Sequence, residues 1–437
     1  MARAASLISK RAGAVPPQHF GKLVTIDGLT IEASGLHVPI GTNVRITTAD
    51  GGIATAEVIG FRGARTTLMA LQSSTSFVSN AAVIPEQGGG DVQVGVGLLG
   101  RVLGALGEPL DGAGPVVAAD RWPLEGHAEN VLERASVHRP IDVGVRAINA
   151  LLTVGEGQRV AIIAGSGVGK SVLLGQMLAG TGADVVVVGL IGERGREVSD
   201  FLATRMSPAV RARAVVVAVP ADHAPVLRLR AAMRATAIAE YFRAQGLKVL
   251  LLIDSLTRVA HAQREIGLAL GEPPTVKGYP PSTFGLIPRL VERAGNHATS
   301  RGSITALYTV LADGDDLDDP IVDAARAIVD GHIVLSRDLA DQGVFPAIEV
   351  GRSLSRVMND IVNRDHAALA QIIRRWWSVY ATNRDLVLMG AYAPGSDQEL
   401  DTAIERHPAI LDFLRQPPDD HVTMADAIDA MAKLVAE

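Results

Sequence analysis

The stretch that decides the fold is Ala164-Gly165-Ser166-Gly167-Val168-Gly169-Lys170-Ser171. It follows an apolar run at residues 160–163 and opens a segment with helical periodicity at residues 171–178. A glycine-rich turn between a buried strand and a helix is the context that a phosphate-binding loop requires. The glycines let backbone N–H groups turn toward phosphate oxygens, and the N-terminus of the helix adds positive charge. The stretch therefore predicts nucleotide binding.

Each position of this loop has an expected task. Lys170 is expected to reach the outer phosphates, and the Ser171 hydroxyl to ligate Mg²⁺. Ala164 stands where the usual pattern has glycine, which requires a negative φ there. The residues expected to hold the phosphates through their backbone are Gly165, Ser166, Gly167, Val168 and Gly169.

Two carboxylates follow other buried strands. Asp254 ends the apolar run 249–253, and Glu193 lies just past the run 185–190. A carboxylate at the C-terminal end of such a strand can hold the water shell of Mg²⁺, which is the role expected of Asp254. Glu193 is expected to orient and activate the attacking water. The alternatives are a helix cap at Asp254 and a surface ion pair at Glu193.

The chain divides into three patterns. Alternating apolar residues and tight turns over residues 20–71 predict a small closed β-barrel. Strands at 160–163, 185–190, 214–219 and 249–253 alternate with helices, which predicts an α/β core with a parallel sheet covered on both faces. Helices are expected at 367–380, 398–406, 409–415 and 424–435. We therefore expect a β-barrel domain at 1–88, a nucleotide-binding domain at 89–362 and a helical domain at 363–437.

Composition excludes several classes. The 437 residues carry 41 Lys and Arg against 47 Asp and Glu, a net charge of −6, so no basic excess points to nucleic acid. The absence of cysteine excludes disulfides, iron–sulfur clusters and thiol nucleophiles. No apolar run reaches the roughly 18 residues of a membrane span. Residues 1–13 lack a signal-peptide core, and we expect a frayed end there or a short amphipathic arm.

Two further patterns contain residue types that can bind metals but lack the spacing of a metal site. The aspartates of residues 313–319 do not have the spacing of a calcium-binding EF-hand loop, so a solvated loop is expected there. The 11 histidines are scattered without ligand spacing, so no zinc site is expected.

With these residues assembled, the chain resembles the hexameric P-loop ATPases of the rotary ATP synthase catalytic-subunit family, and most closely the flagellar and type III secretion export ATPases. The resemblance covers nearly the whole chain. It is carried by Arg139-Pro140-Ile141-Asp142-Val143-Gly144, the loop from Ala164 to Ser171, residues 191–198, Asp254-Ser255-Leu256-Thr257-Arg258, residues 278–282, residues 291–295, residues 331–337 and Ser353-Leu354-Ser355-Arg356.

The resemblance implies a RecA-like core between an N-terminal β-barrel and a C-terminal helical domain, assembled as a homohexameric ring with ATP or ADP and Mg²⁺ at protomer boundaries. Glu193 then looks like the catalytic glutamate, and Arg194 and Arg258 like arginines near the phosphates. Arg356 resembles an arginine finger that reaches the γ-phosphate held by a neighbouring protomer, and Phe345 matches an aromatic residue placed against adenine. Lys170, Glu193 and Arg356 are thus the expected catalytic set.

By the same resemblance, the protein is expected in the cytoplasm, peripherally associated with an inner-membrane export apparatus. Its expected partners are stator and stalk proteins, chaperone–substrate complexes and a membrane export gate, without nucleic acid. The flagellar system is favoured over the virulence injectisome. A rotary ATP synthase subunit fits less well because the C-terminal part is short. A noncatalytic subunit would carry Gln in place of Glu193, and a ring that threads nucleic acid would have more aromatic residues in the barrel.

Overall fold

The computed structural model describes residues 20–72, 76–86, 90–127 and 130–436. The arm expected at residues 1–13 lies outside the described residues. These residues form two compact units. The first contains the described residues up to Asp91 together with Glu265–Glu272, and the second contains Val92–Arg264 and the residues from Pro273 onward.

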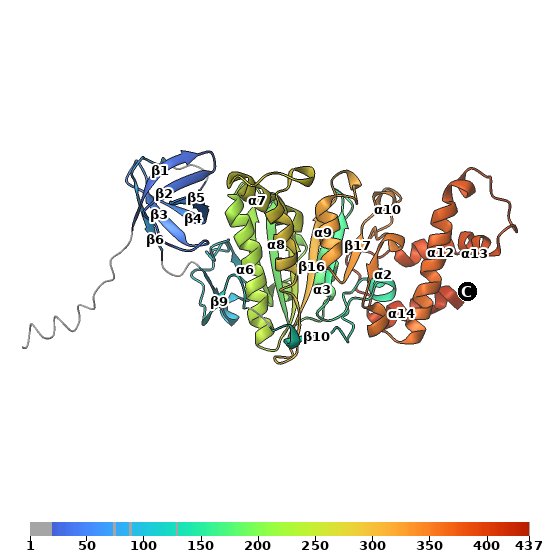
Figure 1. The fold of residues 1–437 in the computed structure, drawn as a ribbon. Coiled ribbons are helices and arrows are strands. Elements are labelled where there is room, and N and C mark those ends of the chain that lie inside the picture. Colours follow the sequence, from blue (N-terminus) through green and yellow to red (C-terminus); the bar gives the residue numbers. More distant parts are fainter. Residues whose placement is uncertain (1–19, 73–75, 87–89, 128–129, 437) are drawn as a thin grey trace, which may run out of the picture. The chain divides into compact units, whose positions relative to one another are not determined.

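The first unit is a closed β-barrel, as the alternating pattern predicts (Figure 1). Its strands pair in the order β1-β2-β5-β4-β3-β6, so the barrel leaves no open sheet edge. Inward-facing side chains such as Leu23, Val44 and Leu68 fill the interior. Gly28 has a φ of 56° in the turn between the first two strands. The strands are β1 (Gly21–Asp27), β2 (Thr30–Ser34), β3 (Asn43–Thr47), β4 (Ile53–Arg62), β5 (Arg65–Ala70) and β6 (Ala82–Pro85).

The second unit is built on a ten-stranded sheet whose main path runs β18-β17-β11-β16-β14-β12-β13-β8. The pairs along this path are parallel except β17 with β18, which is antiparallel. The strands are β8 (Val102–Leu103), β10 (Arg134–Ala135), β11 (Arg159–Ala164), β12 (Val185–Glu193), β13 (Ala214–Pro220), β14 (Lys248–Asp254), β15 (Gly295–His297), β16 (Ser303–Leu311), β17 (Gly331–Val334) and β18 (Leu354–Ser355). A separate ribbon pairs β7 (Asp91–Val94) with β9 (Asp120–Pro123).

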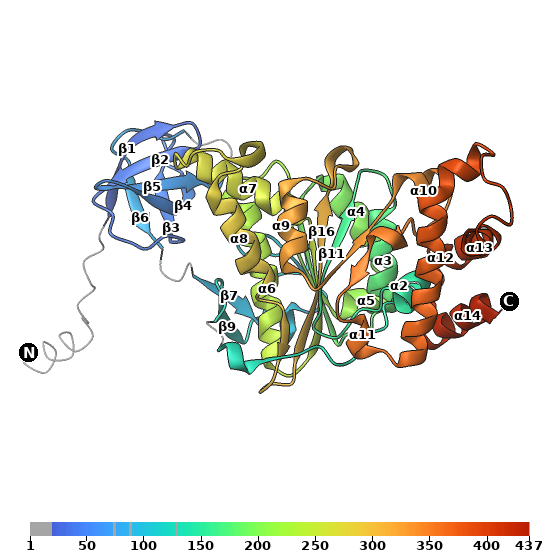
Figure 2. The same ribbon diagram turned by 45° about the vertical axis from the view of Figure 1, so that its right-hand side comes forward.

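Helices cover both faces of this sheet, which confirms the α/β prediction. Figure 2 shows α6, α8 and α9 on one side of the strands and α3, α4 and α5 on the other. The helices up to the end of the sheet are α2 (Arg146–Leu151), α3 (Lys170–Gly180), α4 (Gly195–Thr204), α5 (Pro208–Ala212), α6 (Pro225–Ala244), α7 (Leu256–Ala269), α8 (Pro281–Val291), α9 (Pro320–Ile328), α10 (Arg337–Asp341) and α11 (Met358–Ile361).

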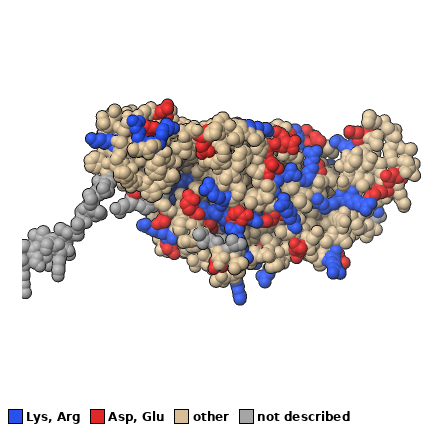
Figure 3. Space-filling model, viewed as in Figure 1, with Lys and Arg blue, Asp and Glu red and all other residues tan. Residues whose placement is uncertain are grey.

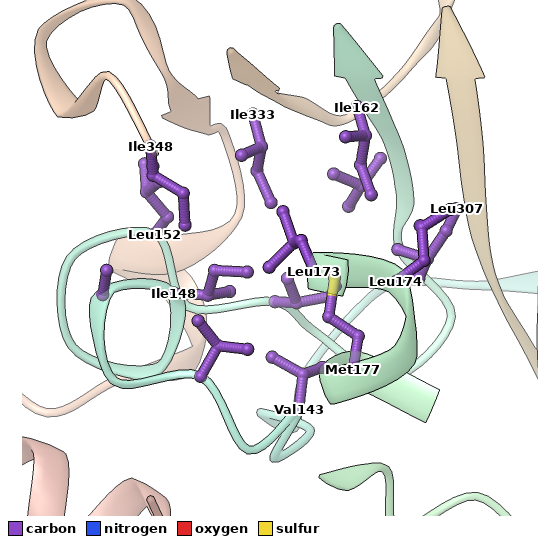
Figure 4. Close-up of a cluster of buried hydrophobic side chains, with 14 of the residues drawn as sticks. Val143, Ile148, Leu152, Ile162, Leu173, Leu174, Met177, Leu307, Ile333 and Ile348 are labelled. Atoms are coloured by element: carbon purple, nitrogen blue, oxygen red, sulfur yellow. The ribbon is translucent and has the colours of Figure 1, made fainter. Parts of the chain in front are cut away.

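The core beneath the P-loop joins sequence-distant elements. Leu173, Leu174 and Met177 of α3 point toward Ile162 of β11 and Ile148 of α2 (Figure 4). Burying each large aliphatic side chain contributes about 1.5–3 kcal/mol. The helix that begins at Lys170 is therefore anchored by its apolar face, and its N-terminus has a fixed position at the edge of the sheet.

The C-terminal segment is helical, as expected, but with different boundaries. Its helices are α12 (Arg364–Leu388), α13 (Gln398–Leu414) and α14 (Met424–Ala436). The two helices expected at 398–406 and 409–415 form the single helix α13, with Pro408 inside it. Proline removes one backbone hydrogen bond, but buried residues on both sides, Ala403 and Ile410, hold the helix against the core.

The surface carries both signs of charge. On the face in Figure 3, Lys and Arg side chains are interspersed with Asp and Glu side chains. This distribution fits the small net charge of −6. Among the described residues, no helix is both long enough and apolar enough to cross a membrane.

Candidate active site

The P-loop joins β11 to α3 in the geometry expected of a phosphate cradle. Gly167 and Gly169 have φ values of 79° and 90°, which a residue with a Cβ adopts only under strain. Ala164 still belongs to β11 and has no positive φ, so alanine at that position costs nothing. The first N–H groups of α3 follow directly, and an anion placed at this turn meets the positive end of the helix.

The carboxylates and the P-loop lysine converge because the strands that precede them run parallel in one sheet. Strands β11, β14 and β12 all end at one edge of the sheet, so Lys170, Asp254 and Glu193 meet there. Lys170 Nζ lies 2.5 Å from Asp254 Oδ1 and 3.6 Å from Glu193 Oε1. The sequence placed these three residues on three separate segments, and the structure brings them together.

These residues line a cavity of about 510 Å³. Two buried polar atoms in it, Glu193 Oε1 and Arg258 Nε, have no hydrogen-bond partner among the described residues. Buried polar groups are ordinarily hydrogen-bonded, so two atoms of opposite charge without a hydrogen bond indicate a place where a polar ligand binds. The remaining lining includes Gly165, Ser166, Gly167, Gly169, Ser171, Arg194, Glu197 and Phe201.

The environment of the cavity changes the proton affinity of Glu193. The pKa of Glu193 is raised to about 7, mainly by burial and also by the nearby Asp254 charge, although Lys170 and Arg258 oppose the shift. A carboxyl group with a pKa near neutrality can accept a proton under physiological conditions. Glu193 therefore has the proton affinity of a general base.

Lys170 remains a cation in this setting. Burial lowers its pKa, but the Asp254 and Glu193 carboxylates outweigh that effect, and the net pKa is raised. The lysine is therefore a fixed positive charge beside the P-loop, which suits electrostatic stabilisation of phosphate oxygens.

The two other expected cavity arginines differ in exposure. Arg194 caps α4, and its side chain is 85% exposed with Nε 3.9 Å from Glu197 Oε1. Arg258 lies on α7 at the wall of the cavity, and its Nε is buried. Of the two, only Arg258 is held at the cavity by packing, while Arg194 is free to reorient toward a ligand.

Phe345, the aromatic residue expected to pack against adenine, lies next to the P-loop. A Cβ built on Gly169 would lie 3.3 Å from Phe345 Cδ1, so the ring packs against the loop backbone. Sequence reasoning missed that the segment after α13 also reaches this place. The Gln416 backbone N–H donates to the Phe345 carbonyl at 2.8 Å, and the Gln176 side chain donates to the Pro417 carbonyl. Long-range contacts of this kind leave no local signal in the sequence.

Tyr392, an aromatic residue in the C-terminal part that could also be considered as a contact for adenine, lies elsewhere. Its hydroxyl contacts Asp401 Oδ1 and the Asp397 carbonyl in the connection between α12 and α13. It does not line the cavity described above.

Arg356 does not line this cavity within one chain. It follows β18, at the edge of the sheet, and its side chain is exposed. Its Nη2 donates to the Arg326 carbonyl at 3.1 Å, near the C-terminus of α9. The structure therefore separates the expected catalytic set into two places, one buried and one on the surface.

The aspartate-rich loop has an unexpected role beside the P-loop. Asp315 pairs with Arg337 at 2.7 Å, and Arg337 Nη2 donates to the Ser166 carbonyl at 3.1 Å. A Cβ on Gly165 would lie only 2.0 Å from Asp315 Oδ1, so a larger residue there would displace the Asp315 side chain. Part of the loop expected to be solvated therefore supports the P-loop from its outer side.

The fold and the site define a P-loop nucleotide-binding protein with a RecA-like core. Residues 144–355 match the nucleotide-binding domain of the ATP synthase alpha/beta family, and residues 362–433 match the C-terminal domain of the type III secretion ATPase EscN. The chain belongs to the ATP synthase alpha/beta family, in its flagellar and type III secretion branch.

Full-length relatives support this membership. The chain is 50% identical to the flagellum-specific ATP synthase of Pseudomonas aeruginosa, over 95% of this chain and 93% of that protein. It is 46% identical to a type 3 secretion system ATPase of Xanthomonas euvesicatoria, over 92% and 91%. The assembled EscN of enteropathogenic E. coli has a TM-score of 0.89 and 39% identity, covering 95% of this chain and all of that one. EscN in complex with its central stalk EscO has a TM-score of 0.86.

Proposed function

We propose that this protein hydrolyses ATP to energise protein export, as a homohexamer whose catalytic sites lie at protomer interfaces. The observation that carries the proposal is the separation within one chain: Lys170, Glu193 and Asp254 converge in one cavity, while Arg356 is exposed at the edge of the sheet. Because Arg356 of the same chain does not reach this cavity, the catalytic set is complete only when a second copy supplies its Arg356. The full-length similarity to assembled EscN supports a ring.

In the proposed reaction, the P-loop backbone and Lys170 hold the β- and γ-phosphates. Glu193 orients a water molecule and accepts its proton as the water oxygen attacks the γ-phosphorus, and the bond to the ADP oxygen breaks. Arg356 of a neighbouring copy stabilises the charge on the transferred group, with Arg194 and Arg258 beside the phosphates. An arginine in this role accelerates phosphoryl transfer by roughly 10³–10⁵. Phe345 packs against the adenine ring.

The residues present fit a magnesium ion carried with the nucleotide. Ser171 supplies a hydroxyl in the first turn of α3, and Asp254 supplies a buried carboxylate in the same cavity. Hydroxyl and carboxylate oxygens are the ligands that Mg²⁺ accepts, often through its water shell. When bound, Mg²⁺ would neutralise charge on the phosphate oxygens. ATP and ADP with Mg²⁺ are therefore the proposed cofactors.

The export system proposed is the flagellar one, supported by the 50% identity to a flagellum-specific relative. Proposed partners are a central stalk, by analogy with the EscN–EscO complex, and further a stator, chaperone–substrate complexes and a membrane export gate. The proposed location is the cytoplasm, peripheral to the inner membrane. Domain boundaries at 88/89 and 362/363 are part of the same proposal.

The proposal is tested by measuring ATP turnover and particle mass over one dilution series. Turnover per chain should fall steeply as the hexamer dissociates, because each site loses the arginine of its neighbour. Equal turnover by monomers and hexamers would overturn the shared site. Expression in a strain lacking the flagellar ATPase should restore motility, whereas restoration only of an injectisome deletion would assign the virulence system.

A further inference from the structure

Thr309 lies at the centre of the site without belonging to any motif of the sequence. It is on β16, the strand between β11, which leads into the P-loop, and β14, which ends at Asp254. The register pairs Ile253 with Tyr308, so the next position on each strand places Asp254 beside Thr309. The Thr309 side chain is fully buried. A buried hydroxyl beside a buried carboxylate must donate to it or to the backbone.

The distances identify the carboxylate as the acceptor. Thr309 Oγ1 lies 2.6 Å from Asp254 Oδ1 and 3.4 Å from the Ile253 carbonyl oxygen. A hydroxyl has one hydrogen to donate, and the shorter contact lies in the range of about 2.5–2.7 Å typical of an O–H donor with an ionised acceptor. Thr309 therefore makes a charge-assisted hydrogen bond to Asp254.

Only one of the two donors to this oxygen is fixed. Asp254 Oδ1 also accepts from Lys170 Nζ at 2.5 Å. Lys170 has a long flexible side chain that is expected to turn toward the phosphates when a nucleotide binds. Thr309 is held by a central strand and cannot leave. Since the terminal torsion of aspartate has a broad energy profile, a fixed donor decides how the carboxylate is oriented.

We propose that Thr309 is a positioning residue for metal-dependent nucleotide binding: its hydroxyl holds the Asp254 carboxylate in the orientation that receives hydrated Mg²⁺. The inference rests on the proposed function of Asp254 beside the metal. Thr309 acts through Asp254 and contacts neither the ion nor the nucleotide. Strand β16 thus becomes the fourth strand that contributes a residue to the site, beside β11, β14 and β12.

The test is the affinity for a fluorescent ATP analogue, measured by titration of the full chain in excess Mg²⁺ and again in EDTA. Wild type should bind more tightly with Mg²⁺. Thr309→Val, which removes the donor and keeps the shape, should lose on the order of tenfold in affinity with Mg²⁺, because hydrogen bonds to charged groups are strong, and less than about twofold in EDTA. Thr309→Ser should restore the Mg²⁺ effect.

The matched control is Thr305→Val. Thr305 is buried on the same strand, four residues before Thr309. Its hydroxyl oxygen accepts a hydrogen bond from the Gly157 N–H at 2.8 Å and has no contact with Asp254. This variant should keep the wild-type ratio of the two affinities. Thr309→Ala, which also lacks the hydroxyl, should repeat the loss seen for Thr309→Val and covers the case in which valine does not fold.

The inference is overturned if Thr309→Val and Thr309→Ala keep the wild-type ratio, or if they lose affinity equally in Mg²⁺ and EDTA, which would indicate a structural role only. Failure of the proposed function looks different. In that case the wild-type protein itself would show no effect of Mg²⁺ on nucleotide affinity, or Asp254→Asn would keep the full wild-type effect.

Discussion

The phosphate cavity and the edge strand of the same sheet contrast in how they hold their charges. In the cavity, Lys170 and Asp254 are nearly buried, with side chains 13% and 5% exposed, and each is fixed by a partner of opposite charge. At the edge, Arg356 is exposed, and the structure assigns it no carboxylate partner among the described residues, only the Arg326 carbonyl. The first set is preorganised within one chain, and the second is available to another molecule.

This difference has a physical reason. A buried charge must have a partner within the same chain, because an unpaired buried charge lowers stability by several kcal/mol. A group paired in this way is not available to bind another molecule. A cation that is to bind a phosphate on a neighbouring copy must instead remain accessible and weakly held. The position of Arg356 beyond β18 satisfies that requirement.

The largest effect on kcat is expected for the exposed residue, Arg356. Arg356→Ala should lower kcat by roughly 10³-fold or more, because the transition-state charge loses its cation. Nucleotide affinity should change little, since the cavity itself is intact. Arg352→Ala, an exposed arginine four residues earlier, is the matched control and should retain activity. A similar loss in both variants, in steady-state assays of the hexamer, would refute a specific role for Arg356.

On the buried side, Glu193→Gln should lower kcat by roughly 10²–10⁴-fold, the range contributed by general bases, while ATP remains bound. Asp200→Asn on α4, which removes an exposed carboxylate paired with Arg196, serves as the control. Single-turnover kinetics separate binding from chemistry here. A variant at Glu193 that hydrolyses ATP at the wild-type rate would remove it from the mechanism.

The raised pKa of Glu193 predicts two dependences on pH with opposite signs. Since the base acts deprotonated, kcat/KM should fall as pH drops below about 7, and Glu193→Gln should lose this acidic limb of the pH profile.

Because the pKa of Glu193 is higher in the folded than in the unfolded chain, the stability contributed by protonated Glu193 is present at low pH and lost as pH rises through about 7. Thermal melts should therefore show Glu193→Gln a few degrees more stable than wild type at pH 8 and little different at pH 5. Equal melting temperatures at both pH values would contradict the shift.

The smallest effect is expected at Phe345, which packs against the P-loop and is 42% exposed. Phe345→Ala should raise KM for ATP by about fivefold, corresponding to roughly 1 kcal/mol of lost ring contact, with kcat nearly unchanged. Phe345→Tyr keeps the ring and should behave like wild type. An unchanged KM for Phe345→Ala would place adenine elsewhere.

Much of the architecture could be predicted because its signals are local. The alternation around Val44 and Ile46 predicts barrel strands, and the apolar runs before Glu193 and Asp254 predict a parallel sheet whose edge brings the carboxylates together. The P-loop motif then locates the phosphates.

What could not be predicted depends on pairing across the chain. Thr309 is one threonine in an apolar strand, and only the register with β14 places its hydroxyl at Asp254. The Asp315–Arg337 pair on the outer side of the P-loop joins residues 22 positions apart and gives no periodic signal. The helices expected at 398–406 and 409–415 are one helix because buried contacts on both sides of Pro408 keep α13 continuous, and local sequence carries no signal of those contacts.

The most direct measurement of a shared site is the ATPase activity of mixed rings. Lys170→Ala and Arg356→Ala are each expected to be inactive alone, since one lacks the phosphate lysine and the other the arginine supplied to its neighbour. After dissociation and joint reassembly, some interfaces pair an intact Lys170 with an intact Arg356, and activity should return to a fraction set by the mixing ratio. Mixed rings that stay inactive at every ratio, although both variants co-assemble, would contradict the account.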